Sequence, residues 1–256
     1  MSATRVFGFP DIHWSERDEP ALEVAIAAQR IFKPDWTVVG GDLLNCGPYT
    51  RHGISTFKEN HGYDLIESEL KPASAFLDVC QKNTKDGRLS VIEGNHDAWL
   101  ERFLVNIPGG ASFQSLLPSK YLMRNRKNAW YIPWNMNNGG IGHVRLHRNL
   151  IVVHGWAAPK FAADRHLQMA KPHSIIYHHT HRAETRTNPM FDGTYVSAWN
   201  AGCLCKRKPI YAHGQSPTDW THGFWVAYIG RTSFTVYTVL VEKGRAVMPD
   251  GREVGA

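Results

Sequence analysis

The sequence predicts an α/β fold in which two packed sheets are flanked by helices. In the first hundred residues, short apolar runs typical of buried strands alternate with longer stretches of helical periodicity. Beyond residue 150, further apolar segments are separated by glycine-bearing turns and add strands to this pattern. A chain of 256 residues is also long enough to bury a substantial core.

The first part of the chain contains three predicted strands, each followed by a predicted helix. The strands are expected at residues 5–9, 36–39 and 89–92, and the helices at residues 19–32, 63–80 and 98–105. Pro20 suits the first turn of its helix, where a missing N–H breaks no hydrogen bond. Because strands and helices alternate, we expect parallel strands joined by right-handed crossovers.

The rest of the chain is read in the same way. Residues 46–61 are polar and irregular and predict a surface loop beside the site. Prolines and aromatic residues interrupt the pattern that follows, so we interpret residues 106–148 as a basic aromatic insertion within a single domain of residues 1–256. One helix is then expected at residues 161–169, with strands at 150–153, 174–177, 194–199, 210–212, 224–229 and 234–241.

Composition narrows the class of protein. Charged residues make up 20% of the chain and hydrophobic residues 43%, which argues against disorder. No apolar run approaches the roughly 20 residues of a membrane span, and the N-terminus lacks the pattern of a secretory signal. We therefore expect a soluble cytoplasmic protein. Cys203 and Cys205 are too close for a zinc ribbon, and all four cysteines are interpreted as structural thiols.

The formal net charge of +6 is unevenly distributed. No acidic residue lies between Glu101 and Asp164, whereas eight cations do: Arg102, Lys120, Arg124, Arg126, Lys127, Arg145, Arg148 and Lys160. Such a face attracts anionic ligands, and aromatic residues among the cations suit the stacking of single-stranded nucleic acid. A solvated basic surface with packed aromatic residues accounts for the same pattern, so both interpretations stay open.

Polar side chains follow five of the predicted strands directly. They are Asp11 and His13, Asp42, Asn95 with His96 and Asp97, His154, and His179 with His181. In open α/β sheets the carboxyl ends of strands converge on one crevice, where ligands bind. Each group alone could be an ordinary polar turn, but five in this order indicate a site. Carboxylate, imidazole and amide ligands suit first-row transition metals rather than calcium, and the set is large enough for two ions bridged by Asp42.

These motifs resemble the signature blocks of the calcineurin-like metallophosphoesterase superfamily. The blocks are Asp11-x-His13, Gly41-Asp42, Gly94-Asn95-His96-Asp97, His154 and His179-Thr180-His181, and they span residues 5–182 in order. The resemblance implies a four-layer α-β-β-α sandwich of two mixed sheets. The last block opens with His178, where the family usually has glycine. The tail around Gly202-Cys203-Leu204 is similar to small phosphoesterases of bacteria and bacteriophages, which would place a phage-encoded chain in the host cytoplasm.

The resemblance also implies roles for these residues. Asp11, His13, Asp42 and His181 would hold one divalent ion, and Asp42, Asn95, His154 and His179 would hold the other. The ions would be Mn²⁺, Fe²⁺, Ni²⁺, Co²⁺ or Zn²⁺, and a hydroxide bridging them would attack phosphorus. His96 would assist the leaving group, and Asp97 would orient His96. Apart from the resemblance, Asn45, Arg51 and His52 are candidate substrate contacts, and solvated loop residues are the favoured interpretation of Arg51 and His52.

The leading function is therefore a dinuclear-metal phosphoesterase, with three substrate classes open. The basic interval favours phosphodiesters, nucleic acid among them. A phosphomonoesterase or protein phosphatase needs only an open metal site, and a cyclic-nucleotide phosphodiesterase would use similar ligands. A non-catalytic scaffold or nucleic-acid-binding module is the alternative from another class, and the intact motifs disfavour it. The sequence leaves the oligomeric state open.

Overall fold

The structure is a computed structural model of the chain, and it describes residues 2–49, 64–106, 109–135, 140–158, 160–208 and 219–256. The predicted strand at 210–212, together with Arg51 and His52, lies outside these ranges. No helix within the described ranges is both long and apolar enough to cross a lipid bilayer.

Six strands form the first sheet, in the order β11-β10-β1-β2-β3-β4. Their bounds are Phe234–Leu240 (β11), Gly223–Ile229 (β10), Thr4–Phe9 (β1), Trp36–Val39 (β2), Leu89–Ile92 (β3) and Ala129–Ile132 (β4). β1, β2, β3 and β4 run parallel, as predicted for the first three, whereas β10 pairs antiparallel with β1, and β11 pairs antiparallel with β10. The carboxyl ends of β1, β2 and β3 therefore lie at one edge of this sheet.

Five strands form the second sheet, in the order β5-β6-β7-β9-β8. Their bounds are His143–His147 (β5), Leu150–Val153 (β6), Ser174–Ile176 (β7), Tyr195–Ala201 (β9) and Ala183–Pro189 (β8). β6, β7 and β9 are parallel, and β5 and β8 pair antiparallel to the sheet at its two edges. Both sheets are thus mixed. β12 (Arg245–Val247) and β13 (Glu253–Gly255) form a separate hairpin against α1.

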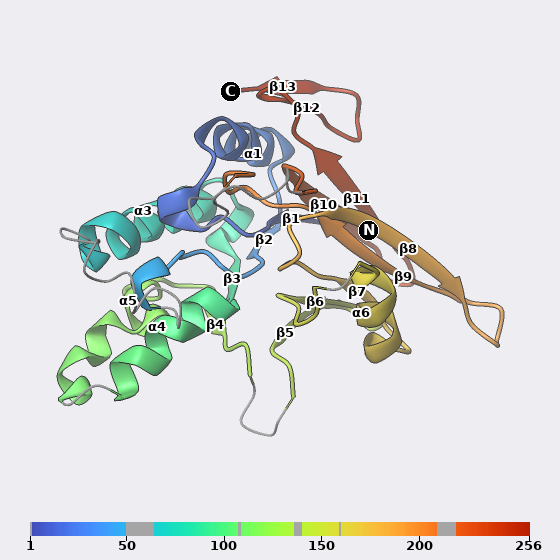
Figure 1. Cartoon of the computed structure of the whole chain (residues 1–256). Coiled ribbons are helices and arrows are strands. Elements are labelled where there is room, and N and C mark those ends of the chain that lie inside the picture. Colours follow the sequence, from blue (N-terminus) through green and yellow to red (C-terminus); the bar gives the residue numbers. More distant parts are fainter. Residues whose placement is uncertain (1, 50–63, 107–108, 136–139, 159, 209–218) are drawn as a thin grey trace.

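Helices cover the outer side of each sheet (Figure 1). They are α1 (Glu19–Phe32), α3 (Lys71–Lys82), α4 (Asn95–Asn106), α5 (Pro118–Tyr121) and α6 (Ala162–Ala170). Asp18 caps α1 by accepting a hydrogen bond from the Ala21 N–H, and Pro20 lies in the first turn as predicted. The helices α1 and α3 pack on the first sheet, and α6 packs on the second.

Three apolar cores join these layers because successive side chains of a strand point to opposite faces. Val6 and Val38 point into the core between the sheets, whereas Phe7 and Val39 point toward the helices. On the second sheet, the side chains of β6 and β7 that point away from the first sheet, such as Val153 and Ile175, pack against α6 in a third core. The architecture is therefore an α-β-β-α sandwich, which confirms the predicted fold class.

Two predicted helices differ at their starts. The helix predicted at 63–80 begins as a π-helix, η3 (Ile66–Leu70), and becomes α3 near Pro72, because proline cannot donate to the carbonyl four residues earlier. The helix predicted at 98–105 begins at Asn95, so the central polar motif forms the first turn of α4. Polar side chains that bind free N–H groups favour such a helix start.

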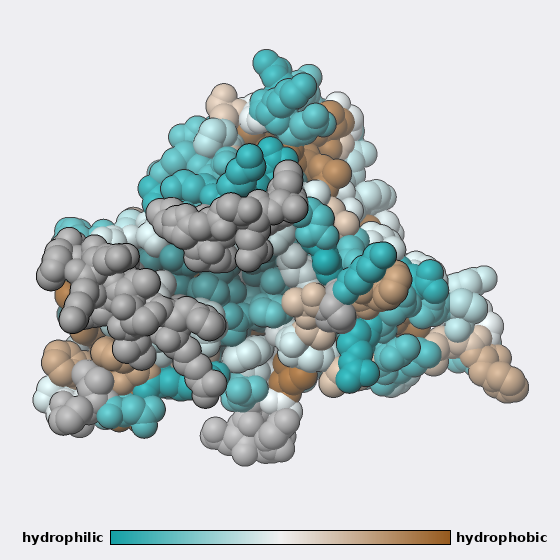
Figure 2. All heavy atoms as spheres, in the orientation of Figure 1, coloured by the Kyte–Doolittle hydropathy of each residue, from teal (hydrophilic) through white to brown (hydrophobic). Residues whose placement is uncertain are grey.

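The segment 106–148 contributes one strand to each sheet. β4 extends the first sheet beside β3, and β5 forms a hairpin with β6 in the second. Neither strand is evident in the sequence pattern, because both lie at a sheet edge and are only partly buried. Figure 2 shows that the centre of the viewed face is hydrophilic, with apolar residues gathered at the tip of the β8–β9 hairpin.

Candidate metal centre

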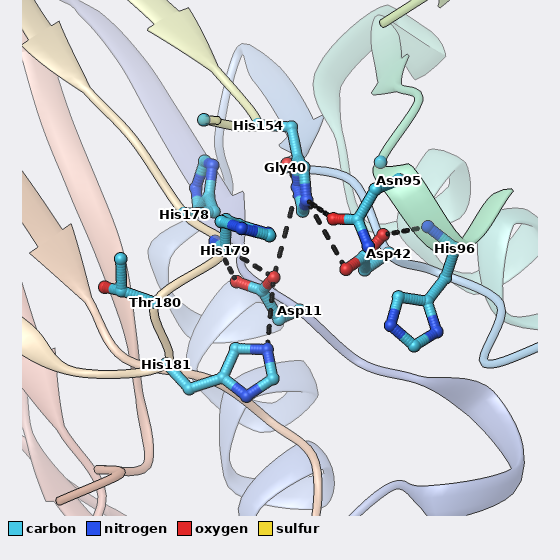
Figure 3. Close-up of polar contacts among 12 residues, drawn as sticks. Asp11, Gly40, Asp42, Asn95, His96, His154, His178, His179, Thr180 and His181 are labelled. Carbon is cyan, nitrogen blue, oxygen red and sulfur yellow. Dashed lines mark hydrogen bonds and ion pairs between the residues drawn. The ribbon is translucent and has the colours of Figure 1, made fainter. Parts of the chain in front are cut away.

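The polar side chains predicted from the strand ends meet between the two sheets (Figure 3). Asp11, Asp42 and His154 are almost completely buried, with at most 1% of each exposed. His13, Asn95 and His181 are also buried, and His179 is half-buried. Charged and polar groups are rarely buried without partners, so their convergence marks a functional centre.

One group of donor atoms lies around Asp11 and the two histidines His13 and His181. The Nε2 atoms of these histidines are 3.2 Å apart. His181 Nε2 lies 3.5 Å from Asp11 Oδ1, and His13 Nε2 lies 3.6 Å from Asp42 Oδ2. Ring nitrogens and carboxylate oxygens therefore face one small volume.

A second group lies on the other side of Asp42. His154 Nε2 is 3.0 Å from Asn95 Oδ1 and 3.4 Å from Asp42 Oδ2. The candidate ligand atoms of Asp42, His154 and His179 all lie within 4.8 Å of one another. His154 Nδ1 is 3.1 Å from the Gly40 carbonyl, so a proton on Nδ1 donates there and Nε2 is directed toward Asp42.

Asp42 is the residue that the two groups share. Its carboxylate also accepts a hydrogen bond of 2.9 Å from the His96 N–H at the start of α4. The Asp42 carboxylate packs against the bare backbone of Gly94, where an added Cβ would lie 2.0 Å from Asp42 Oδ1. Glycine at position 94 is therefore required by this close approach.

Four of the candidate ligands adopt left-handed backbone conformations. The φ angles are 47° at His13, 47° at Asp42, 74° at His179 and 59° at His181. Such angles are uncommon for residues other than glycine and cluster at functional sites. Asn200 stabilises the last turn, because its buried amide donates to the His178 carbonyl and to Thr180 Oγ1.

Ionisation of the centre follows from its mixture of acids and imidazoles. Burial opposes the charge of Asp11, but His181 and His154 outweigh it and lower the pKa of Asp11 to about 2. Burial likewise opposes the charge of His154, but Asp42 and Asp11 raise its pKa to about 9. Burial and the neighbouring His96 lower the pKa of His13 to about 3. The centre therefore combines ionised carboxylates with a neutral His13.

The expected pairing of Asp97 with His96 is wrong. The Asp97 carboxylate accepts hydrogen bonds from the Leu44 and Gly94 N–H groups, each 2.9 Å long, and so joins the Asp42 loop to α4. His96 Nδ1 lies instead 2.6 Å from the Asn45 carbonyl. Burial and the charge of Asp42 raise the pKa of Asp97 to about 8. Asp97 is thus placed to hold two loops together and does not contact the His96 ring.

His96 itself lies at the margin of the centre. Its ring contacts His13 at a centroid distance of 4.5 Å and Trp99 at 4.1 Å. His96 also belongs, with His13 and Asp42, to a set of candidate ligand atoms within 4.8 Å of one another. The position is therefore compatible with a proton donor above the centre or with a further ligand.

His178, the departure from the family pattern, is buried between the sheets. Its Nδ1 lies 2.8 Å from the Val153 carbonyl, and its Nε2 accepts a hydrogen bond of 3.1 Å from Trp225 Nε1. The ring fits only because Gly40 has no side chain, since a Cβ there would lie 2.3 Å from His178 Cε1. Burial lowers the pKa of His178 to about 4, which keeps the ring neutral.

The sequence did not single out the residue that holds the Asn45 loop. Glu69 is fully buried and accepts hydrogen bonds from Ser15 Oγ and from the backbone N–H groups of Asn45 and Cys46. A signal was present, because Glu69 falls between Leu65 and Ala73 on the buried face of its helical segment. An acidic residue on an apolar face indicates a specific buried partner.

A cavity of about 280 Å³ opens over the centre. Its walls are His13, Asp42, Asn95, His96, Ala158, His179, Thr180, His181, Arg182, Asp219 and Trp220. A larger hollow of about 640 Å³, lined by Lys82 and residues 124–127 among others, contains none of the predicted site residues. The volume of a cavity alone would therefore not identify the candidate site. The smaller cavity contains the converging donors.

The donor set fits divalent cations. Imidazole nitrogen and carboxylate oxygen are ligands of first-row transition metals, and two sets of three such donors, both of which include Asp42, have their ligand atoms within 4.8 Å of one another. The His13 and His181 Nε2 atoms face each other at 3.2 Å, an arrangement that a cation between them would stabilise. Asp42 contributes to both groups of donors described above.

Comparison with known proteins identifies the family of this chain. The model of the calcineurin-like phosphoesterases matches residues 4–225 of the chain. A search of curated proteins found no significant match.

Solved structures similar to this chain include three from different organisms. Vps29 from Chaetomium thermophilum is 13% identical, over 99% of this chain and 94% of its own, with a TM-score of 0.44. A metallophosphoesterase from Sphaerobacter thermophilus is 13% identical over 98% and 86%, with a TM-score of 0.42. The E. coli phosphoesterase Yfce is 14% identical over 97% and 96%, with a TM-score of 0.38. The functional conclusion therefore rests on the family match and on the centre itself.

Proposed function

The chain belongs to the calcineurin-like phosphoesterase family, and we propose that it hydrolyses phosphodiesters at a centre that holds two divalent cations. The observation that carries this proposal is the position of Asp42 between two groups of converging donors. Asp11, His13, Asp42 and His181 would hold one ion, and Asp42, Asn95, His154 and His179 the other. Manganese, iron, nickel, cobalt and zinc suit these ligands.

When bound, two such cations polarise the phosphoryl oxygens and make a water molecule acidic enough to be a nucleophile near neutral pH. The chain supplies the orientation of the ligands. The Gly40 carbonyl sets the proton of His154 on Nδ1, and the Gly94 and Leu44 N–H groups anchor Asp97 under the ligand loops. These contacts reduce the reorganisation required when substrate binds.

His96 is proposed to donate a proton to the leaving oxygen. Its Nδ1 faces the Asn45 carbonyl at 2.6 Å, so a proton on Nδ1 is held there and Nε2 is the atom available to substrate. Asn45 therefore acts through its backbone, as a residue that orients His96. The half-buried position of the ring leaves it within reach of the cavity.

Charge near the cavity supports a phosphodiester or nucleic-acid substrate. Arg102, from the acid-free interval, lies with its guanidinium carbon 6.0 Å from the Trp134 ring, and Trp134 in turn contacts His154 at 6.4 Å. Arg126 does not contribute to this face, because it is buried and paired with Asp78 at 2.5 Å. The effective basic face is therefore smaller than the sequence suggests, and one of its cations is connected to the centre through Trp134.

The test compares esters with the same chromophore. Metal-loaded protein is assayed with bis-p-nitrophenyl phosphate and p-nitrophenyl phosphate in Mn²⁺, Ni²⁺ or Zn²⁺, and then with single-stranded and duplex DNA. We expect chelator-sensitive hydrolysis with a higher kcat/KM for the diester. Hydrolysis that survives chelation in wild-type protein would contradict the metal assignment. A clear preference for the monoester would contradict the diester assignment.

A further inference from the structure

The wall of the cavity beyond His181 contains none of the candidate metal ligands. Trp220 contacts the His181 ring edge to face at a centroid distance of 4.1 Å, with an interplanar angle of 76°. Arg182 lies beside it, and its Nη1 donates to Asp219 Oδ2 at 3.2 Å. All three residues line the cavity, and Trp220 is half-buried there. This wall combines an aromatic surface with a directed cation.

A continuous row of ring contacts connects this wall to His96. Trp220 contacts His181, His181 contacts His13 at 5.0 Å, and His13 contacts His96 at 4.5 Å. Along this row, the candidate metal ligands His181 and His13 lie between Trp220 and His96. A leaving group next to His96 leaves the Trp220 end for whatever else the phosphorus carries.

A phosphomonoester carries nothing else, whereas a diester carries a second organic group. Asp219 offsets the charge of Arg182, which therefore acts at this wall as a directional hydrogen-bond donor more than as an additional phosphate ligand. The indole N–H of Trp220 has no hydrogen-bond partner among the described residues. An aromatic face with two kinds of donor matches a planar ring that carries acceptor atoms, such as a nucleobase.

We propose that Trp220 and Arg182 form a subsite for the retained ester group of a nucleoside phosphodiester, with the base stacked on Trp220 and an acceptor atom of the base facing Arg182. This inference rests on the proposed phosphodiesterase function and names its substrate class. An aryl ester shares the planar ring but lacks the acceptor atoms, so it distinguishes stacking from base recognition.

The test keeps one leaving group and changes only the retained one. Three p-nitrophenyl phosphodiesters are compared, in which the retained group is thymidine through its 5′ oxygen, phenyl or methyl. Wild-type protein should prefer thymidine over phenyl and phenyl over methyl. Stacking is worth about 1–3 kcal/mol for each base. Trp220→Ala should therefore lower kcat/KM for the thymidine ester about 5- to 150-fold more than for the methyl ester, mainly through KM. Trp220→Phe should restore most of the loss.

Arg182→Gln should remove the preference for thymidine over phenyl while the preference for phenyl over methyl remains. The matched control is Trp130→Ala, because Trp130 is half-exposed on β4 and outside the cavity. Metal content is measured in every variant, because Trp220 contacts His181. If Trp220→Ala does not fold, Trp220→Leu removes the ring and keeps an apolar side chain.

Three results would contradict these proposals: the first two would overturn the subsite alone, and the third would overturn the proposed function. Equal losses for all three esters in the Trp220 variants would overturn the subsite, because they would indicate only support of His181. The same holds for wild-type protein that hydrolyses the three esters at equal kcat/KM. Absence of hydrolysis of any ester by metal-loaded wild-type protein would instead overturn the proposed function, and the subsite with it.

Discussion

Every candidate oxygen ligand follows a strand of the first sheet, whereas the second sheet contributes only imidazoles. The oxygen ligands are Asp11, Asp42 and Asn95, and the first sheet adds the imidazole of His13. The imidazoles of the second sheet are His154, His179 and His181. Neither sheet has a complete set. The centre therefore depends on the core between the sheets, which determines how far the carboxylates lie from the imidazoles.

The same comparison explains why buried histidines of the second sheet ionise differently. His154 faces two carboxylates from the first sheet, and its pKa is raised to about 9. His166, on α6, has no carboxylate neighbour. Its Nε2 accepts from the Trp156 N–H, its Nδ1 lies 2.8 Å from the Ala162 carbonyl, and burial lowers its pKa to about 4. At His154 the two close carboxylates therefore outweigh burial, whereas at His166 burial dominates.

The largest effect is expected from removing the charge that both sheets share. Asp42→Asn keeps a residue that tolerates the φ of 47° and removes the carboxylate. We expect bound metal to fall well below two ions per chain and activity to fall further than in any variant below. Metal analysis and kcat/KM measure this. Asp192→Asn, on an exposed turn, is the control. Two ions per chain in Asp42→Asn would contradict the shared-ligand role.

His96 tests whether the first sheet contributes more than ligands. If His96 donates a proton, His96→Ala should keep its metal and lose on the order of 10²–10⁴ in kcat. The loss should be smaller for an ester whose leaving group is already acidic, because that leaving group needs less protonation. Loss of one metal ion from this variant would indicate instead that His96 is a ligand, as its distances to His13 and Asp42 permit.

Acid should destabilise the second-sheet side through His166. Its pKa rises from about 4 in the folded chain to 6.5 in the unfolded chain, so unfolding takes up a proton between these values. The contribution of His166 to the free energy of unfolding is fully present above pH 6.5 and is lost as the pH falls toward 4. At about 1.4 kcal/mol per pKa unit, the loss is at most about 3.5 kcal/mol.

Urea unfolding of metal-free protein between pH 7 and 4.5 measures this loss. His166→Phe keeps a ring against Tyr177 and should show a shallower dependence, by about one proton. An unchanged slope in that variant would show that His166 does not titrate as described.

The smallest effect is expected from substitutions on the two faces of β7, which can be compared by their stability and metal affinity. Ile175 and Ile176 are both fully buried in β7, but Ile176 points into the core between the sheets and Ile175 points toward α6. Replacing either with valine should cost about 0.5–1.5 kcal/mol of stability. Only Ile176→Val should also weaken metal binding, because only that core spaces the carboxylates from the imidazoles. Equal metal affinity in both variants would contradict this dependence.

Much of the fold could be predicted because its signals are local. The strands β1, β2, β3, β6 and β7 are short apolar runs followed at once by polar residues. Both the runs and the polar residues are visible in the sequence. β8 was missed because it is an edge strand, largely exposed, and its polar residues show no apolar run. β12 and β13 were missed because three-residue strands are too short to show a period.

Roles were harder to predict than positions. Asp97 was identified as part of the site, but its partners are N–H groups of Leu44 and Gly94, and no pattern in the sequence shows which N–H a carboxylate will accept from. Glu69 and Asn200 hold ligand loops through contacts with residues about 20 or more positions away. Such contacts depend on loop packing, which the identity of the residues does not reveal.

The sequence by itself determined which strands end in candidate ligands, because an apolar run followed by a polar residue is a property of neighbouring positions. The tertiary structure alone decided which atoms face one another. Packing of the two sheets brings Asp42 to 3.4 Å from His154 Nε2, and left-handed backbone angles at His13, Asp42 and His181 direct their side chains inward. Distances across a core depend on the packing of both sheets together, and for that reason they cannot be read from either one.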